Sequence, residues 1–129
     1  MGKIETQISG DLTIRKVIGD LTIDEMLDDV KKFFAGQPTK FFLLDLSAGS
    51  IATLSAEEIR TVARFVHDHA HVQIGGKTII VAPDDLNYGV ARMYLAFSES
   101  RSPPFPVCLF RKLSDALDCI RAHVPVTGS

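Results

Sequence analysis

Two short apolar segments do most to limit the folds open to this chain. Residues 41–46 read FFLLDL, apolar except for Asp45, and residues 78–82 read TIIVA. Apolar residues that do not alternate with polar ones indicate strands buried on both faces, which is typical of parallel sheets covered by helices. A chain of 129 residues has the length of one domain and can bury a core without disulfides. The expected class is therefore α/β.

Segments with helical periodicity separate these strands. A helix is expected over residues 23–35, because Thr22 and Glu25 form a capping-box pattern. Ser55 starts a second capping box, and its helix ends near residue 69. Asp84 or Asp85 caps a third helix. The apolar stripe of that third helix consists of Leu86, Val90, Met93, Tyr94 and Phe97.

The two ends of the chain complete the order of elements. Alternating residues from 4 to 18, with a turn at 9–11, predict a β-hairpin. Residues 98–104 are expected to form a polar loop, and a last strand over 106–110 precedes a fourth helix that ends near 123. The predicted order is ββαβαβαβα, an open mixed sheet with an antiparallel edge and four helices. Residues 4–123 form one domain, and 124–129 are expected to be a flexible tail.

Charge and hydropathy exclude several partner classes. Sixteen acidic against fourteen basic residues give a net charge of -2, which offers no basic surface for nucleic acid. The apolar runs are far shorter than the roughly 20 residues that span a bilayer, and no signal peptide is evident, so we expect a cytoplasmic protein without a membrane span. Cys108 and Cys119 are expected to be reduced, and no cofactor is implied.

Four segments carry a resemblance to a known family. They are GDLT at 19–22, LDLS at 44–47, GKTIIVA at 76–82, and VCLF at 107–110 followed by LSDAL at 113–117. In this order they resemble the STAS domains (sulfate transporter and anti-sigma-factor antagonist), in particular the small bacterial SpoIIAA-like proteins. The resemblance covers about residues 4–123. It implies a SpoIIAA-like domain that regulates by binding, without catalysis.

The family resemblance also implies a phosphorylation site. In the family, a Ser or Thr of an Asp-Ser-Ser-Gly motif at the start of the second helix is phosphorylated by a partner kinase. The corresponding stretch here lacks the Asp and the Gly, and only Thr53 and Ser55 offer the hydroxyl, with Ser50 and Ser47 just upstream. Glu57 and Glu58 would oppose a phosphate on Ser55, and the alternative is that Ser55 only caps the helix.

A partner surface is expected where the second and third helices begin. It comprises residues 47–58 and the neighbouring loop 83–92. Tyr, Arg and Met are enriched at interfaces, although core packing also accounts for such residues. The expected partner is a protein, either a kinase or an anti-sigma-like regulator, or a second copy of the chain. The candidate contact residues are Asp45, Asp84, Asp85, Tyr88, Arg92 and Met93.

Three other readings stay open. A small-molecule or lipid carrier would need an apolar cavity, lined by residues such as Phe65, Met93 and Phe97. A receiver-like enzyme would use Asp45 as phosphoacceptor together with a divalent ion, since Asp45, Asp84 and Asp85 are expected at the carboxyl ends of strands. A metal site would pair His67 with His71, although histidines in a last helical turn also complement the helix dipole.

Overall fold

The structure, a computed structural model, describes residues 2–36, 38–69, 76–100 and 106–123. Its five-stranded sheet has the order β1-β2-β3-β4-β5. Strand β1 pairs antiparallel with β2 and every other pairing is parallel, which confirms the mixed sheet with an N-terminal hairpin. The strands are β1 (Lys3–Ser9), β2 (Leu12–Asp20), β3 (Phe41–Ser50), β4 (Lys77–Val81) and β5 (Val107–Phe110).

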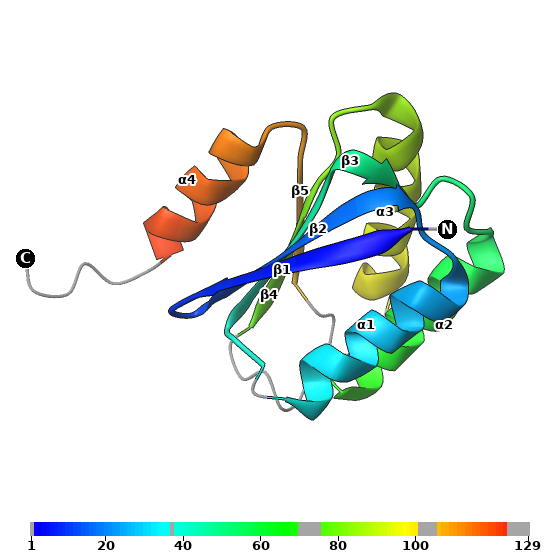
Figure 1. Ribbon diagram of the computed structural model, residues 1–129, viewed down its shortest axis with the longest axis horizontal. Coiled ribbons are helices and arrows are strands. Elements are labelled where there is room, and N and C mark those ends of the chain that lie inside the picture. Colours follow the sequence, from blue (N-terminus) through cyan, green and yellow to red (C-terminus); the bar gives the residue numbers. More distant parts are fainter. Residues whose placement is uncertain (1, 37, 70–75, 101–105, 124–129) are drawn as a thin grey trace, which may run out of the picture.

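Four helices cover the sheet on both faces. They are α1 (Ile23–Ala35), α2 (Ala56–His69), α3 (Asp85–Glu99) and α4 (Leu113–His123). Helices α1, α2 and α3 lie together on one face and α4 lies on the other (Figure 1). The sequential strand order explains this arrangement: when strands advance in one direction, right-handed crossovers place every connecting helix on the same face. Helix α4 follows the last strand and covers the face that the crossovers leave open.

The core has two parts, one on each face of the sheet. The larger part fills the space between the sheet and α1 to α3, and the smaller lies under α4. Leu44 and Leu46 point to the first, whereas Phe41 and Leu43 point to the second, as alternation along a strand requires. A central strand buried on both faces therefore accounts for the apolar run at residues 41–46.

Two predicted boundaries were wrong. Asp45 was expected at the end of its strand, but β3 continues to Ser50, so Asp45 lies in mid-strand and is buried. The extension forms because residues 48–50 pair with the end of β2 beyond the point where β4 stops. Ser98 was expected in a loop, but it is buried in the last turns of α3.

Some sequence expectations fall outside the described residues, namely the tail at 124–129 and most of the loop before β5. Cys108 and Cys119 are not joined in a disulfide, and both are half-buried. In the described part of the chain, no helix is long and apolar enough to cross a membrane.

Candidate functional site

A buried asparagine joins the end of β3 to the start of α3. Asn87 is 1% exposed, and its Oδ1 accepts hydrogen bonds from the Ile51 N–H at 2.9 Å and the Ser50 hydroxyl at 3.2 Å. Its Nδ2 donates to the Gly49 carbonyl at 3.0 Å and to Asp84 Oδ2 at 2.8 Å. The amide thereby makes four hydrogen bonds, the full capacity of the side chain. The β3–α2 loop and the first turn of α3 are held as one unit.

Asp84 is the N-cap of α3, one of the two residues expected in that role. Its Oδ1 accepts from the Asn87 N–H at 2.8 Å. This bond to the backbone holds the pKa of the Asp84 carboxyl below its usual value. The two oxygens of the Asp84 carboxylate are thus used to cap α3 and to hold the Asn87 side chain.

Asp85 and Tyr88 are engaged by a single arginine at the end of β5. Arg111 Nη1 donates to Asp85 Oδ1 at 2.7 Å and to the Pro83 carbonyl at 3.2 Å. Its guanidinium lies over the Tyr88 ring, 3.9 Å from the ring centre. These contacts tie the 83–88 segment to the strand beside it. Residues 83–86 of this segment remain exposed.

The most exposed large apolar side chain at this end of the sheet is Leu86. It was expected in the apolar stripe of α3, but it is 75% exposed. The inward face of the helix is set by its buried residues Asn87, Ala91, Tyr94 and Ser98, and Leu86 falls outside it. Arg92 is exposed as well, whereas Met93 is half-buried and packs against the core. Leu86 is thus an exposed residue that sequence patterning misassigned, because its place in the first turn fits either face.

The candidate hydroxyl groups of the β3–α2 segment differ in their surroundings. Ser47 is exposed on β3, and Ser50 is half-buried and bonded to Asn87. Thr53 is exposed, and its hydroxyl donates to the Leu21 carbonyl at 3.4 Å. Ser55 is exposed and forms the predicted capping box: its Oγ accepts from the Glu58 N–H at 3.1 Å, while its own N–H donates to Glu58 Oε1 at 2.8 Å.

Asp45 does not join the other two strand-end carboxylates. By alternation with Leu44 and Leu46 it points to the α4 face, and its Oδ1 accepts from the Ser47 N–H at 2.9 Å. Among the described residues, no group of three or more His, Cys, Asp or Glu side chains is placed to hold a metal ion. The divalent-ion site of the receiver-like reading therefore does not form from Asp45, Asp84 and Asp85.

Solved structures share this arrangement of sheet and helices. An anti-sigma factor antagonist from Mycobacterium paratuberculosis is 15% identical with a TM-score of 0.59, and the match covers 94% of this chain and 95% of that one. The unphosphorylated anti-sigma factor antagonist SpoIIAA is 11% identical at 0.55, covering 94% and 98%. The fold is SpoIIAA-like.

A third solved structure extends this result beyond the anti-sigma factor antagonists. It is an uncharacterized DUF3478-family protein from Shewanella loihica PV-4, described as having a SpoIIAA-like fold, and it is 20% identical with a TM-score of 0.52. The match covers 92% of each chain. No protein-family model and no curated protein matches the sequence. The likeness is one of fold over nearly the whole chain.

The expected pair of His67 and His71 falls partly outside the described residues. His71 lies outside the described residues. His67 is half-buried with its Nδ1 3.6 Å from Asp68 Oδ1, and His69 stacks on Phe65 and bonds to the Phe65 carbonyl at 2.8 Å. His69 therefore closes the last turn of α2 by packing and hydrogen bonding.

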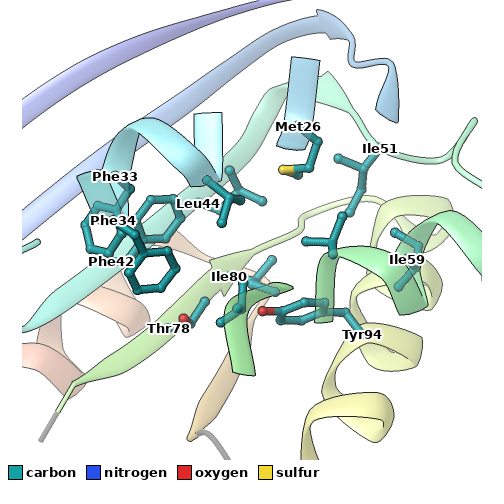
Figure 2. A pocket seen from close by; sticks show the side chains of 13 residues that line it. Met26, Phe33, Phe34, Phe42, Leu44, Ile51, Ile59, Thr78, Ile80 and Tyr94 are labelled. Carbon is teal, nitrogen blue, oxygen red and sulfur yellow. The ribbon is translucent and has the colours of Figure 1, made fainter. Parts of the chain in front are cut away.

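An apolar cavity of about 60 Å³ lies between the SpoIIAA-like sheet and helices α1 and α2 (Figure 2). Phe33, Phe34, Phe42 and Leu44 border one side, and Tyr94 from α3 borders another. None of Phe65, Met93 and Phe97, which the carrier reading named, lines it. Its volume is well below the roughly 150 Å³ that holds a benzene molecule. The described residues thus offer no preformed site for a lipid here.

The Tyr94 phenol beside this cavity makes stability depend on alkaline pH. Burial raises the pKa of Tyr94 to about 12, and a hydrogen bond with Ser98 opposes this. The folded state therefore binds the phenolic proton more tightly than the unfolded chain, so stability falls as the pH rises from about 10 towards 12. Over this pH range, the free energy of unfolding of Tyr94→Phe should fall by about 2 kcal/mol less than that of the wild type, as measured by urea unfolding. Tyr88→Phe is the control, and identical pH profiles for Tyr94→Phe and wild type would contradict the expectation.

Proposed function

We propose that this chain is a non-catalytic regulatory module that binds a partner protein through residues 47–58 and 83–92, named here the partner surface. The exposed Leu86 carries the proposal. It stands beside Asn87, which holds both segments of the surface together, so an apolar side chain is presented to solvent on a rigid support. Apolar anchors surrounded by polar residues are the usual centres of protein interfaces.

The shared fold suggests the class of partner. Two solved proteins with this fold are anti-sigma factor antagonists, and one of them is described in its unphosphorylated form. By analogy, the partner of this chain is an anti-sigma-type regulatory protein or its kinase, met in the cytoplasm. Fold analogy supplies the class, and the partner surface supplies the place of contact.

Phosphorylation of Ser55 or Thr53 would act as the switch. A phosphate on Ser55 would sit at the positive end of α2, which favours it, but it would displace the Glu58 N–H from the hydroxyl and lie close to Glu57 and Glu58. Thr53 is free of this conflict, because its hydroxyl bonds only weakly to Leu21. Either phosphate adds charge in the middle of the partner surface, so partner affinity changes without refolding.

Affinity capture with matched variants tests the partner surface. Leu86→Glu should leave the melting temperature within about 2 °C of wild type, because the side chain is exposed, and should weaken capture of the partner at least about tenfold. Ile8→Glu is the matched control, because Ile8 is 66% exposed on β1 outside the partner surface. The captured protein is identified by mass spectrometry and its affinity for each purified variant is measured by calorimetry.

Two outcomes would overturn parts of this proposal. If wild type and Leu86→Glu bind the captured protein with equal affinity, that protein does not bind at the partner surface. A Ser55→Glu variant and a Thr53→Glu variant are measured in the same assay. If both bind the partner as tightly as the wild type, the proposed phosphorylation switch is wrong.

A further inference from the structure

The outer edge of strand β1 has no neighbouring strand. Strand β1 stands at one end of the sheet order and pairs only with β2 (Figure 1). Six of its seven residues are exposed, and Ile8 is 66% exposed. In the described part of the chain, no backbone group pairs with this outer edge. The main-chain groups of the edge are therefore available to a strand of another molecule.

The hairpin turn decides which main-chain groups point outward. Strands β1 and β2 are joined by a two-residue turn at 10–11, across which Ser9 faces Leu12. The residues that flank such a turn exchange both hydrogen bonds, and pairs of this kind alternate along the two strands. The odd-numbered residues of β1 therefore bond to β2. The outward groups belong to the even-numbered residues, Ile4, Thr6 and Ile8.

Strand β1 lacks the features that usually prevent pairing at an edge. It contains no proline, and its pairing with β2 runs without a bulge from Lys3 to Ser9. Its side chains on the α1 face are uncharged, because Ile4 packs against the core on that face and Thr6 and Ile8 follow by alternation. Proline, bulges and inward-pointing charges are the ordinary means of blocking an edge. Residues 3–9 thus remain able to pair.

The pattern of β1 side chains is symmetric about Thr6. Residues 4–8 read Ile-Glu-Thr-Gln-Ile, so an isoleucine lies two positions away on each side. If a second copy pairs antiparallel about a two-fold axis at Thr6, Ile4 of each copy lies opposite Ile8 of the other. Outward groups then meet outward groups at three residue pairs, each of which exchanges two hydrogen bonds. The edge is therefore complementary to itself, as a two-fold interface requires.

Charge favours this register over its neighbours. An axis at Glu5 would place the two Glu5 carboxylates directly opposite each other, where like charges repel. An axis at Gln7 would leave Ile4 without an opposite residue in the strand. With the axis at Thr6, Glu5 faces Gln7 of the second copy and keeps Lys16 of its own β2 beside it. No like charges are directly opposed in that arrangement.

We propose that this chain forms a symmetric dimer in which β1 pairs antiparallel with β1 of a second copy about Thr6. The two five-stranded sheets become one continuous sheet, and Ile8 of each copy is covered by Ile4 of the other. One strand from each copy is a small contact beside the roughly 1,600 Å² of a standard interface, so we expect a micromolar dissociation constant. The edge lies outside 47–58 and 83–92, so the dimer stands or falls independently of the regulatory function.

Analytical ultracentrifugation of the purified chain from about 5 μM to 1 mM tests the dimer. We expect wild type to dimerise within this range. Ile8→Glu should raise the dissociation constant at least about tenfold, because each dimer loses two Ile4–Ile8 contacts. Leu113→Glu is the matched control, an exposed apolar residue on α4 that is 38% exposed, and it should stay within about twofold of wild type.

Two outcomes of this experiment would overturn the dimer. One is a wild type that stays monomeric up to about 1 mM. The other is a dimer whose dissociation constant is the same for wild type and Ile8→Glu, since that dimer would use another surface. No partner protein is present in the measurement, so neither outcome bears on residues 47–58 and 83–92.

Disulfide cross-linking tests the register in a chain that also carries Cys108→Ala and Cys119→Ala. Thr6→Cys places two thiols at the two-fold axis, where the paired Cα atoms are about 5.5 Å apart, within the range that a disulfide bridges. Glu5→Cys is the control, because the two copies of residue 5 are diagonal neighbours about 7–8 Å apart. Oxidation should therefore yield a covalent dimer of Thr6→Cys. Equally fast cross-linking of Glu5→Cys would show that the register is wrong.

Discussion

The Gly49→Ala variant is expected to unfold about 10 °C below the wild type, a loss of about 3 kcal/mol in a chain of this length. A Cβ at residue 49 would lie 2.5 Å from the Val17 carbonyl oxygen and 2.6 Å from Val17 Cγ1. Val17 is fully buried on the adjacent strand β2, so neither its backbone nor its side chain has room to move. Relief requires the two strands to separate.

Gly89 provides a matched control for this substitution. It lies within α3, and a Cβ there would meet nothing within 4 Å. Because alanine is the better helix former, Gly89→Ala should stabilise the protein by about 0.5–1 kcal/mol. Thermal and urea unfolding, followed by circular dichroism, measure both variants. A Gly49→Ala variant as stable as wild type would show that β2 and β3 do not approach as closely as described.

The Asn87→Ala variant should lose about 3 kcal/mol and leave the Ile51 amide less protected from hydrogen exchange. Truncation removes four side-chain hydrogen bonds and strands the buried Ile51 N–H and the Gly49 carbonyl. A buried polar group without a partner costs about 1–3 kcal/mol. Unfolding by urea gives the global loss, and hydrogen exchange measured by NMR gives the local one. The β3–α2 loop should be freed before the rest of the sheet.

Arg92→Ala on the same helix is the control for Asn87, since Arg92 is exposed, and it should remain within about 0.5 kcal/mol of wild type. An Asn87→Asp variant separates the two roles of the amide. It keeps an acceptor for the Ile51 N–H, but it loses the donor to Gly49 and places a second carboxylate beside Asp84. If the Ile51 amide of Asn87→Ala exchanges at the wild-type rate, the Asn87 hydrogen bonds are not needed to hold the β3–α2 loop in place.

The local signals in the sequence sufficed for the elements themselves. The capping boxes at Thr22 and Ser55 mark helix starts that the structure confirms, because a cap depends on residues three positions apart. The end of β3 was harder to predict. Residues 47–50 lie beyond the apolar run at 41–46, and residues 48–50 are extended because β2 continues far enough to pair with them.

The candidate site divides in the same way. Sequence patterning predicted the two segments of the proposed partner surface, and it predicted the capping role of Asp84, which the structure confirms. It did not find the roles of Asn87 and Leu86, because each depends on a contact or an exposure set by elements far apart in the chain. An Asn in a first helical turn is an ordinary surface residue until a neighbouring element covers it.

The sequence by itself determined the class of this protein, the order of its elements and most of their ends, because apolar periodicity and capping act over a few residues. Only the tertiary structure decided the strand order and, through it, the face each helix covers. It also decided which polar residues became buried. Asn87 found every hydrogen-bond partner, and Leu86 beside it was left in solvent. Those outcomes depend on packing between distant segments, which no local pattern encodes.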